Sequence, residues 1–329
     1  MKSIEIVLPV YNEEKGLEIF NTALFNVLHA LKNNYTFTVI YVVDKCSDDS
    51  FKVVERLADR FENIIGLELS NRFGHQNSLM AGLSICKGDA VIMMDSDMEH
   101  PPEVIPKLLE CYENGFEIVY TERLYNEKTG FFKRMTSKLF YKIINWLSTV
   151  RIQESTADFR LISEKVLKSL KNDIKEQNPF LRGVLPWMGF LSTKVRYTSG
   201  IRVAGKSKYG FVRMLRFGFG GIISFSNKPL MLSIYIGVFF AFMSLLYIVY
   251  LLIGYFLGAT TPAGWMSTIA FVAFMGSLQL VFLGVVGVYI GKVFEETKKR
   301  PSFIIENYTK SFSNTINDGS KQCDKSQCE

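Results

Sequence analysis

The first half of the chain alternates short apolar runs with amphipathic stretches. The runs are rich in Val and Ile and read IEIVLPV (4–10), FTVIYVV (37–43), IIGLEL (64–69), AVIMMD (90–95) and FEIVYTE (116–122). Between them, the segment 48–61 repeats apolar side chains at helical spacing, and the segment 101–115 opens with two prolines and closes on Asn-Gly. These patterns predict strands separated by helices. We therefore expect an α/β fold with a Rossmann-like, mostly parallel sheet covered on both faces, whose ligands bind beyond the carboxyl ends of the strands.

The second half has a different pattern, because residues 229–291 contain no charged residue and no His. The segment ATTPAG divides this apolar stretch into two halves, at about 230–257 and 265–291. Each half exceeds the ~20 residues that a helix needs to cross a bilayer. Two buried helices of a soluble protein are the alternative, but such helices normally carry a polar face. The pattern predicts a two-helix transmembrane hairpin after a globular domain at 1–228.

Basic residues flank the two predicted spans on the same side. They are Lys206, Lys208, Arg213, Arg216 and Lys228 before the first span, and Lys292, Lys298, Lys299 and Arg300 after the second. The positive-inside rule then places the globular domain and both termini in the cytoplasm. Residues 293–329 are expected to form a cytoplasmic tail, disordered from Thr309 onward because its composition is polar.

Two further segments combine basic and aromatic residues. In the segment at about 131–149, apolar side chains recur every fourth residue beside a stripe formed by Arg134, Lys138 and Lys142. The segment at about 207–226 has the same character. We expect both to be interfacial amphipathic helices on the membrane surface. The alternative for the first is an ordinary surface helix that packs its apolar face on the domain.

Composition adds limited information. The 329 residues are 48% hydrophobic, and the formal net charge of +6 suits an anionic partner. The five cysteines have no metal-ligand spacing, which favours a reducing compartment. The N-terminal apolar run contains Glu5 and is short, so it is not expected to be a signal peptide. Nucleic acid is not an expected partner, since the basic residues cluster beside the hydrophobic spans; a homo-oligomer is left open.

Three acids follow the fourth predicted strand at alternate positions: Asp95, Asp97 and Glu99. In an extended segment such positions face one side, so the three carboxylates could converge on a cation. Oxygen ligands suit Mg²⁺ or Mn²⁺, which commonly also hold substrate phosphates. The alternative is a solvated acidic turn before a helix.

The sequence resembles the family 2 glycosyltransferases, specifically the polyisoprenyl-phosphate branch that includes dolichyl-phosphate mannose synthase and bactoprenol glucosyltransferases. The matching segments, in family order, are LPVYNEE, DSDMEHPPE, ADFRLIS, RVAGKSKYG and GVYIGKVFEETKKRP. This resemblance implies a GT-A fold with a D-x-D metal site and Mg²⁺ or Mn²⁺ as cofactor. It implies that Asp95 and Asp97 bind the metal and the donor diphosphate, and that Glu99 also reaches the metal.

The same resemblance implies further site residues. Pro9, Tyr11, Glu13 and Asp44 match nucleotide-binding positions, and Arg123, Arg134 and Arg202 match positions near the acceptor phosphate. Lys206 and Lys208 are additional cationic candidates for that phosphate, with solvated surface charges as the alternative. Asp97 and Asp158 are the catalytic candidates. Asp158 matches an Asp of the bactoprenol-type enzymes, and we expect it to assist or to orient rather than to remove a proton obligatorily; orienting a sugar hydroxyl or pairing with Arg160 are its alternatives to a base.

The chain departs from the family pattern after the second strand. The usual D-D-G-S reads DKCSDD here, with Lys45 and Cys46 in place of Asp and Gly. Lys45 either alters recognition of the nucleotide base or points to solvent without effect. His75, after the third strand, is expected to start a helix and to have no functional role, although a donor contact is the alternative.

These features predict a bacterial inner-membrane enzyme that transfers a sugar from a nucleotide sugar to undecaprenyl phosphate with inversion. Such a lipid-linked sugar serves modification of cell-envelope polysaccharide, and UDP-glucose is the first candidate donor. A processive polysaccharide synthase is the second hypothesis, but the chain has too few spans and no Q-x-x-R-W signature; FLRGVLPW is only a faint echo. A degenerate scaffold or flippase component is the third, and the intact D-x-D argues against it.

Overall fold

The computed structural model describes residues 1–124, 156–177, 179–198, 228–257 and 264–309. The described chain divides into two compact units, one that contains a β-sheet and one that contains two long helices.

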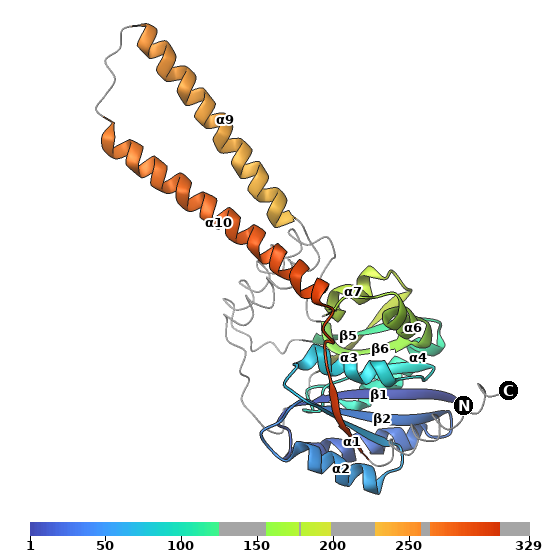
Figure 1. Cartoon of the computed structure of the whole chain (residues 1–329). Helices are drawn as coiled ribbons and strands as arrows, with labels where there is room; N and C mark the ends of the chain where they lie inside the picture. Colours follow the sequence, from blue (N-terminus) through green and yellow to red (C-terminus); the bar gives the residue numbers. More distant parts are fainter. Residues whose placement is uncertain (125–155, 178, 199–227, 258–263, 310–329) are drawn as a thin grey trace, which may run out of the picture. The chain divides into compact units, whose positions relative to one another are not determined.

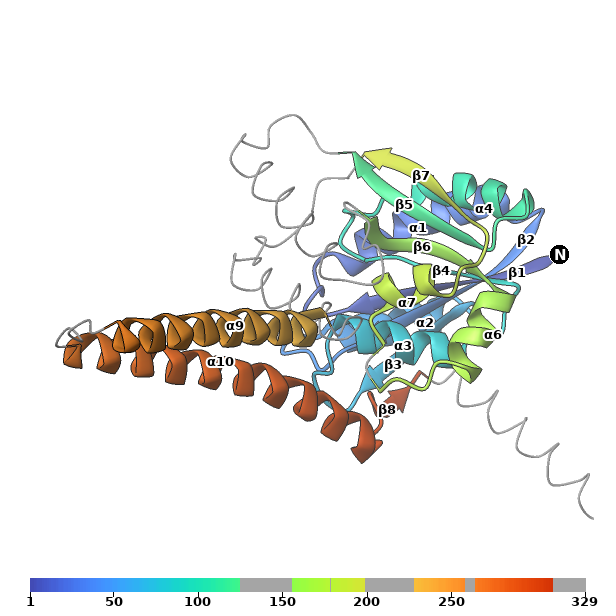
Figure 2. The ribbon, with the colours of Figure 1, turned by 90° about the horizontal axis from the view of Figure 1, so that it is seen from above.

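The first unit is built on one eight-stranded sheet. Its strands, in sheet order, are β7 (Ser192–Thr198), β5 (Ile118–Leu124), β6 (Thr156–Ser163), β4 (Ala90–Met93), β1 (Lys2–Val10), β2 (Tyr35–Val43), β3 (Ile64–Leu69) and β8 (Ile305–Tyr308). Figure 2 shows β7 at one edge and β8 at the other. The four strands β4, β1, β2 and β3 run parallel, while β6 and β8 are antiparallel to their neighbours β4 and β3. The expected α/β fold class is confirmed, with a sheet that becomes mixed on both flanks.

Helices cover both faces of this sheet. They are α1 (Leu17–Leu31), α2 (Ser50–Arg60), α3 (His75–Ile85), the 3₁₀ helix η1 (Pro102–Val104), α4 (Ile105–Glu113), α6 (Glu164–Asn172) and α7 (Leu181–Trp187). Apolar residues of α1, α2 and α4 share one core with Ile4, Ile6 and Leu8 of β1. On the opposite face, α3 approaches so closely that a Cβ on Gly82 would lie 2.4 Å from Val7 Cγ1. Figure 1 shows α1 and α2 on one side of β1 and β2, and α3 on the other.

The five strands expected from the apolar runs are all present, because each buries residues on both of its faces. In β1, for example, every residue from Ile6 to Val10 is buried. The expected helices are also present as α2 and as η1 with α4. The carboxyl ends of β1, β2 and β4 meet at one edge of the sheet, because these strands are parallel. That edge is where a ligand site is expected.

Strand β6 was not expected from the hydrophobic pattern. Its sequence contains Asp158 and Arg160, which interrupt the apolar run, yet both are buried, at 6% and 1% exposure. They pair with each other, with 2.6 Å between Arg160 Nη2 and Asp158 Oδ1. A buried strand can therefore carry charge when opposite charges neutralise each other inside the fold.

The chain after residue 300 also differs from the expectation of a simple tail. Residues Ile305–Tyr308 form β8, which pairs antiparallel with β3 at the edge of the sheet. Thr309, where disorder was expected to begin, is buried at 4% exposure and bonds to Gly66 in both directions. The first unit thus includes residues that lie beyond both long helices in the sequence.

The second unit contains the two expected apolar helices, α9 (Lys228–Phe256) and α10 (Trp265–Lys298). Both are long and apolar enough to cross a bilayer, with mean hydropathies of 2.1 over Leu230–Tyr247 and 1.8 over Phe274–Lys298. Large apolar side chains point outward from both helices, such as Tyr235 at 66% and Leu280 at 71% exposure. Helix α10 continues several residues past the expected end at 291, into a charged final segment.

Candidate active site

The loops that follow β1 and β2 are joined to each other by hydrogen bonds. The Asn12 side chain donates to Ser47 Oγ (3.0 Å) and accepts from the Ser47 amide (2.9 Å). The Glu13 amide donates to Ser50 Oγ (3.0 Å). Asn12 has a φ of 55°, a left-handed conformation that Asn tolerates better than most residues. These bonds hold Tyr11 and Glu13, both expected nucleotide contacts, beside the end of β2.

Asp44 anchors the turn that precedes α3. Its carboxylate is buried and accepts two backbone amides, Phe73 on Oδ1 (2.8 Å) and Gly74 on Oδ2 (2.8 Å). The same turn places the Arg72 guanidinium 4.1 Å from the centroid of the Tyr11 ring. Asp44 therefore holds the turn that places the Arg72 guanidinium over the ring of Tyr11, one of the expected nucleotide residues.

The fourth expected nucleotide residue, Pro9, lies inside β1 opposite Val42 of β2. Its carbonyl accepts a long hydrogen bond from Ser96 Oγ (3.5 Å) in the segment after β4. Pro9, Tyr11, Glu13 and Asp44 thus gather at the carboxyl ends of β1 and β2, next to the acids that follow β4.

The two departures from the family pattern both have partners in the fold. Lys45 Nζ lies 2.8 Å from Glu306 Oε2 and 3.7 Å from Glu68 Oε1. Cys46 Sγ accepts the Asn12 amide (3.2 Å), and burial raises the pKa of this thiol. Lys45 therefore forms ion pairs with two carboxylates of the fold. Cys46 is a protonated thiol at neutral pH, because its pKa is raised.

The three acids follow β4 as expected, but the chain does not stay extended. Met98 has a φ of 65°, and Asp97 Oδ1 accepts the Glu99 amide (3.0 Å). This hydrogen bond closes a local Asx turn. The expected alternation of side-chain directions therefore ends at Asp97, and Glu99 does not face the same side as Asp95 by strand geometry alone.

His100 fixes the backbone at the start of this turn. Its buried ring accepts the Asp95 amide on Nδ1 (2.8 Å), stacks on Phe159 at 5.3 Å and meets Tyr197 edge-on at 6.2 Å. Nδ1 also lies 3.5 Å from Asp95 Oδ2, so this ring nitrogen faces both the backbone and the side chain of Asp95. The position of Asp95 therefore depends on a packed aromatic cluster.

Arg123, an expected acceptor-phosphate contact, lies near the end of β5. Its Nη1 donates to Glu99 Oε2 (3.1 Å), and both side chains are partly exposed. The fold therefore brings one cation assigned to the acceptor next to one acid assigned to the metal. An arginine at this position can also form charge-assisted hydrogen bonds to phosphate oxygens.

The acids after β4 offer carboxylate oxygens, which are the type of ligand that a hard divalent cation prefers. Asp95 and Asp97 are partly exposed and stand at the strand end, so they are the two residues that would hold Mg²⁺ or Mn²⁺. One oxygen of Glu99 is engaged by Arg123. Among the described residues, no group of three or more His, Cys, Asp or Glu side chains is arranged around a metal position.

Asp158 is the centre of a charged cluster built from three elements. Oδ1 accepts from Arg160 Nη2 (2.6 Å) and from Arg182 Nε (2.9 Å), and Oδ2 accepts from Arg182 Nη2 (2.8 Å). His75 Nε2 lies 3.2 Å from Asp158 Oδ2 and 3.7 Å from Asp95 Oδ1. The helix start expected at His75 is present, but its ring bridges the cluster to the first acid of the D-x-D.

Charge interactions set the protonation of this cluster. Burial raises the pKa of the Asp158 carboxyl, but Arg182, the hydrogen bond from His75 and Arg160 together hold it well below its ordinary value. Burial lowers the pKa of His75, whereas the charge of Asp95 and the contact with Asp158 raise it, and the net pKa lies above 6.5. Asp158 is therefore a permanent carboxylate near neutral pH and a poor proton acceptor.

Arg182→Gln is expected to destabilise the first unit, because it removes two charge-assisted hydrogen bonds from Asp158. The expected cost is about 2 kcal/mol, or a fall in Tm of roughly 4–8 °C. Thermal unfolding of the purified chain measures this change. Arg196→Gln is the matched control, since Arg196 makes one 3.1 Å contact with Glu122 on an exposed edge strand. An equal Tm for the Arg182 variant and the parent would contradict the assigned role.

Several expected residues lie outside the described part of the chain. They are the acceptor-phosphate candidates Arg134, Arg202, Lys206 and Lys208, and the two interfacial helices at about 131–149 and 207–226. These assignments stay predictions.

Comparison with known proteins gives the family. The model of the family described as glycosyl transferase family 2 matches residues 5–171. An uncharacterized glycosyltransferase of Bacillus subtilis (strain 168), YkcC, is 35% identical over 301 residues, which cover 92% of this chain and 92% of that protein. The chain belongs to glycosyl transferase family 2.

Another relative of this family 2 glycosyltransferase is the bactoprenol glucosyl transferase of Shigella phage SfV. It is 36% identical over 304 residues, which cover 92% of the present chain and 98% of the relative. Among solved structures, glucosyl-3-phosphoglycerate synthase from Mycobacterium tuberculosis, in complex with Mn²⁺, UDP-glucose and phosphoglyceric acid, aligns with a TM-score of 0.46. That alignment has 15% identity and covers 68% of this chain and 78% of the other. A similarity at this level does not bear on the ligands of the present enzyme.

Sequence reasoning missed three side chains that the structure brings to this region of the glycosyltransferase. They are Arg72, His100 and Arg182. His75 was considered, but no functional role was expected for it and a donor contact was only the alternative. His100 stands in the same DSDMEHPPE segment as the acids, so its place in the motif was an available signal. Arg182 belongs to the FLRGVLPW segment that echoed a synthase motif. Arg72 carried no local signal, because its partner Tyr11 comes from a distant element.

Proposed function

We propose that this glycosyltransferase moves one sugar from a nucleoside-diphosphate sugar to a polyprenyl phosphate and releases a nucleoside diphosphate. The observation that carries the proposal is the match over 92% of the chain, both apolar helices included, to relatives named bactoprenol glucosyl transferase. UDP-glucose is the first candidate donor, and undecaprenyl phosphate is the first candidate acceptor. The acids after β4 and the neighbouring Arg123 supply the charges that such a reaction requires.

The reaction is a direct displacement. A phosphate oxygen of the lipid attacks the anomeric carbon, the bond from that carbon to the donor diphosphate breaks, and the configuration inverts. Phosphate monoesters have a second pKa near ~6, so the attacking oxygen is largely deprotonated at neutral pH and needs no strong base. A reaction that needs no strong base agrees with the environment of Asp158, whose ion pairs hold its pKa well below the ordinary value and make it a poor proton acceptor.

One group of residues would bind the sugar donor and another would bind the lipid phosphate. Asp95 and Asp97 would hold the divalent ion, which neutralises charge on the leaving diphosphate. Arg123, with Arg134, Arg202, Lys206 and Lys208, would hold the lipid phosphate. Asp158 keeps His75 beside Asp95 and so positions the donor side of the site. Tyr11 and Asp44 stand at the nucleotide end.

The acceptor requires a membrane, and we infer that α9 and α10 form a transmembrane hairpin in the bacterial inner membrane. Their large apolar side chains are outward-facing, and Lys228 at the start of α9 and Lys298 at the end of α10 are the basic flanks of the pair. The positive-inside rule then places the active site and both termini in the cytoplasm.

The test is transfer by the purified full chain from a panel of nucleotide sugars to undecaprenyl phosphate, with Mg²⁺, Mn²⁺ or a chelator. We expect one sugar per lipid, by mass spectrometry, with one preferred donor and no product after chelation. A product with a long saccharide chain would favour a processive synthase. Absence of transfer from every donor with either metal would favour a scaffold role.

A further inference from the structure

Strand β8 and the residue before it contact the loop after β2 and the turn after β3, which carry Asp44 and Arg72 of the candidate site. The chain leaves α10 at Lys298 and, after residues 299–304, enters β8 beside β3. The Ile304 carbonyl accepts the Ser70 amide (3.0 Å), at the start of the turn that carries Arg72. The Glu306 carboxylate accepts from Lys45 Nζ (2.8 Å), in the loop after β2.

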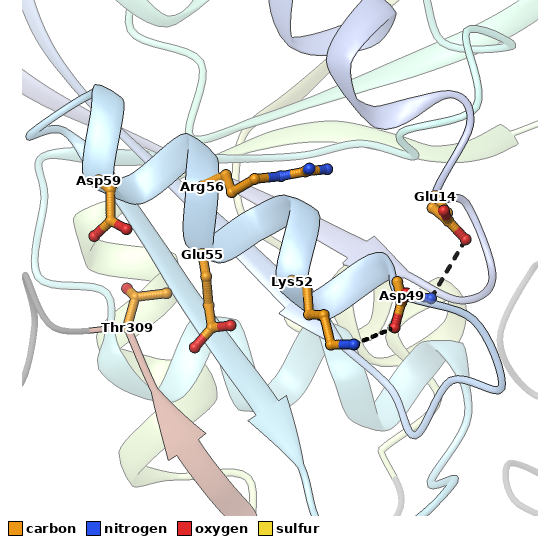
Figure 3. Close-up of a pocket in the computed structure, with 7 residues that line it drawn as sticks. All are labelled: Glu14, Asp49, Lys52, Glu55, Arg56, Asp59 and Thr309. Carbon is orange, nitrogen blue, oxygen red and sulfur yellow. Dashed lines mark hydrogen bonds and ion pairs between the residues drawn. The ribbon is translucent and has the colours of Figure 1, made fainter.

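A close-fitting contact at Gly66 fixes the register of this strand. Thr309 Oγ1 accepts the Gly66 amide (3.0 Å), and the Thr309 amide donates to the Gly66 carbonyl (3.0 Å). A Cβ on Gly66 would lie 2.6 Å from both Thr309 Cγ2 and Val54 Cγ1. Thr309 also lies at the wall of a charged hollow of about 500 Å³ along α2, lined by Glu14, Asp49, Lys52, Glu55, Arg56 and Asp59 (Figure 3).

A short path of contacts connects β8 to the site. Lys45 pairs with Glu306, and its amide donates to Asp44 Oδ1 (3.2 Å). Asp44 holds the amides of Phe73 and Gly74, and so the turn in which Arg72 covers Tyr11. Asn307 Nδ2 donates to Glu68 Oε2 (2.6 Å), which keeps the carboxylate of Glu68 at the side of the Lys45 ammonium.

We propose that β8 is a positioning element for donor binding, and that Lys45 is its contact in the nucleotide loop rather than a reader of the base. Lys45 and Glu306 are positioning residues, since they act through Asp44 and the turn at 70–74. This inference rests on the proposed function, because it takes the donor to be a nucleotide sugar. It accounts for the loss of the usual Asp at position 45, where an Asp would face Glu306 and Glu68.

The test uses the full chain and reverses the charges of the pair. We expect Glu306→Lys and Lys45→Glu each to raise the KM for the donor about three- to fivefold, as for loss of an exposed ion pair, with kcat nearly unchanged. The double variant restores the parental KM. The order of preference among nucleotide bases stays the same in all three variants. Glu113→Lys is the matched control, because Glu113 forms an equally exposed pair with Lys2 (2.7 Å).

Hydrogen exchange provides a readout that needs no turnover. In Glu306→Lys, and more strongly in Thr309→Val, the amides of Gly66, Ser70, Phe73 and Gly74 are expected to exchange faster than in the parent. If no nucleotide sugar is used, the proposed function fails, and hydrogen exchange still decides whether β8 holds these loops. The positioning role is overturned if Glu306→Lys matches Glu113→Lys in exchange at these amides, or if Lys45→Glu alone changes the base preference.

Discussion

Replacing Asp97 by Asn lowers kcat by about 10³-fold or more, if Asp97 holds the divalent ion under the donor diphosphate. A bound metal contributes several kcal/mol to stabilisation of a developing negative charge, and each 1.36 kcal/mol corresponds to about a factor of ten in rate. Asn retains an Oδ1 that can accept the Glu99 amide, so the turn after β4 is preserved. The measurement is initial-rate transfer to undecaprenyl phosphate at saturating donor.

Two further measurements and a control variant separate loss of the metal from loss of the fold. We expect the Asp97 variant to stay in the membrane fraction and to keep its Tm, because its backbone contacts are intact. Asp59→Asn is the control, since Asp59 is an exposed acid on α2. Activity equal to that of the parent would remove Asp97 from the metal site and undermine the D-x-D assignment.

Asp158→Asn produces the second large effect, on stability as well as on activity. The change removes the carboxylate that neutralises Arg160, which is 1% exposed, and Arg182. Loss of one partner from a buried ion pair costs about 3–5 kcal/mol, so Tm falls by roughly 10 °C. Activity also falls, because His75 loses its anchor beside Asp95.

The pH dependence separates this role from general-base catalysis. The pKa of Asp158 is depressed in the folded chain, so its stabilising contribution is complete above about pH 4 and declines as the pH falls through the folded pKa. The difference in Tm between parent and variant therefore narrows only in strong acid. Asp49→Asn, at an exposed pair with Lys52 (2.9 Å), is the control and leaves Tm nearly unchanged. A normal Tm with a large loss of kcat would instead identify Asp158 as a base.

Much of the fold follows from local sequence patterns, and strands β6 and β8 depart from these patterns for different reasons. Apolar runs located β1 to β4 because parallel central strands bury both faces, and they located β5 because its residues from Ile118 to Thr121 are buried. Strand β6 was missed because Asp158 and Arg160 interrupt its apolar pattern, and their pairing, with the added contacts of Arg182 and His75 to Asp158, exists only in the folded chain. Strand β8 was not predicted, because its sequence IENY is mostly polar and it pairs with β3 at an exposed edge of the sheet.

The candidate site shows the same division. The acids after β4 were found because they follow a buried strand in a recognisable motif. The bend at Met98 was not predicted, since a φ of 65° in a non-glycine residue depends on its surroundings. The placement of His75 between Asp158 and Asp95 was not found either, because it joins residues that are far apart in the chain.

The return of the chain to β3 has a practical consequence for preparing a water-soluble form of the catalytic unit. A fragment truncated before α9 would lose β8 and leave the backbone groups of β3 free to pair with other molecules, which promotes aggregation. Deleting α9 and α10 while joining residues 301–309 through a Gly/Ser linker would retain all eight strands. Crystallisation trials and inhibitor screens with this enzyme are better served by such an internally deleted chain than by a truncated one.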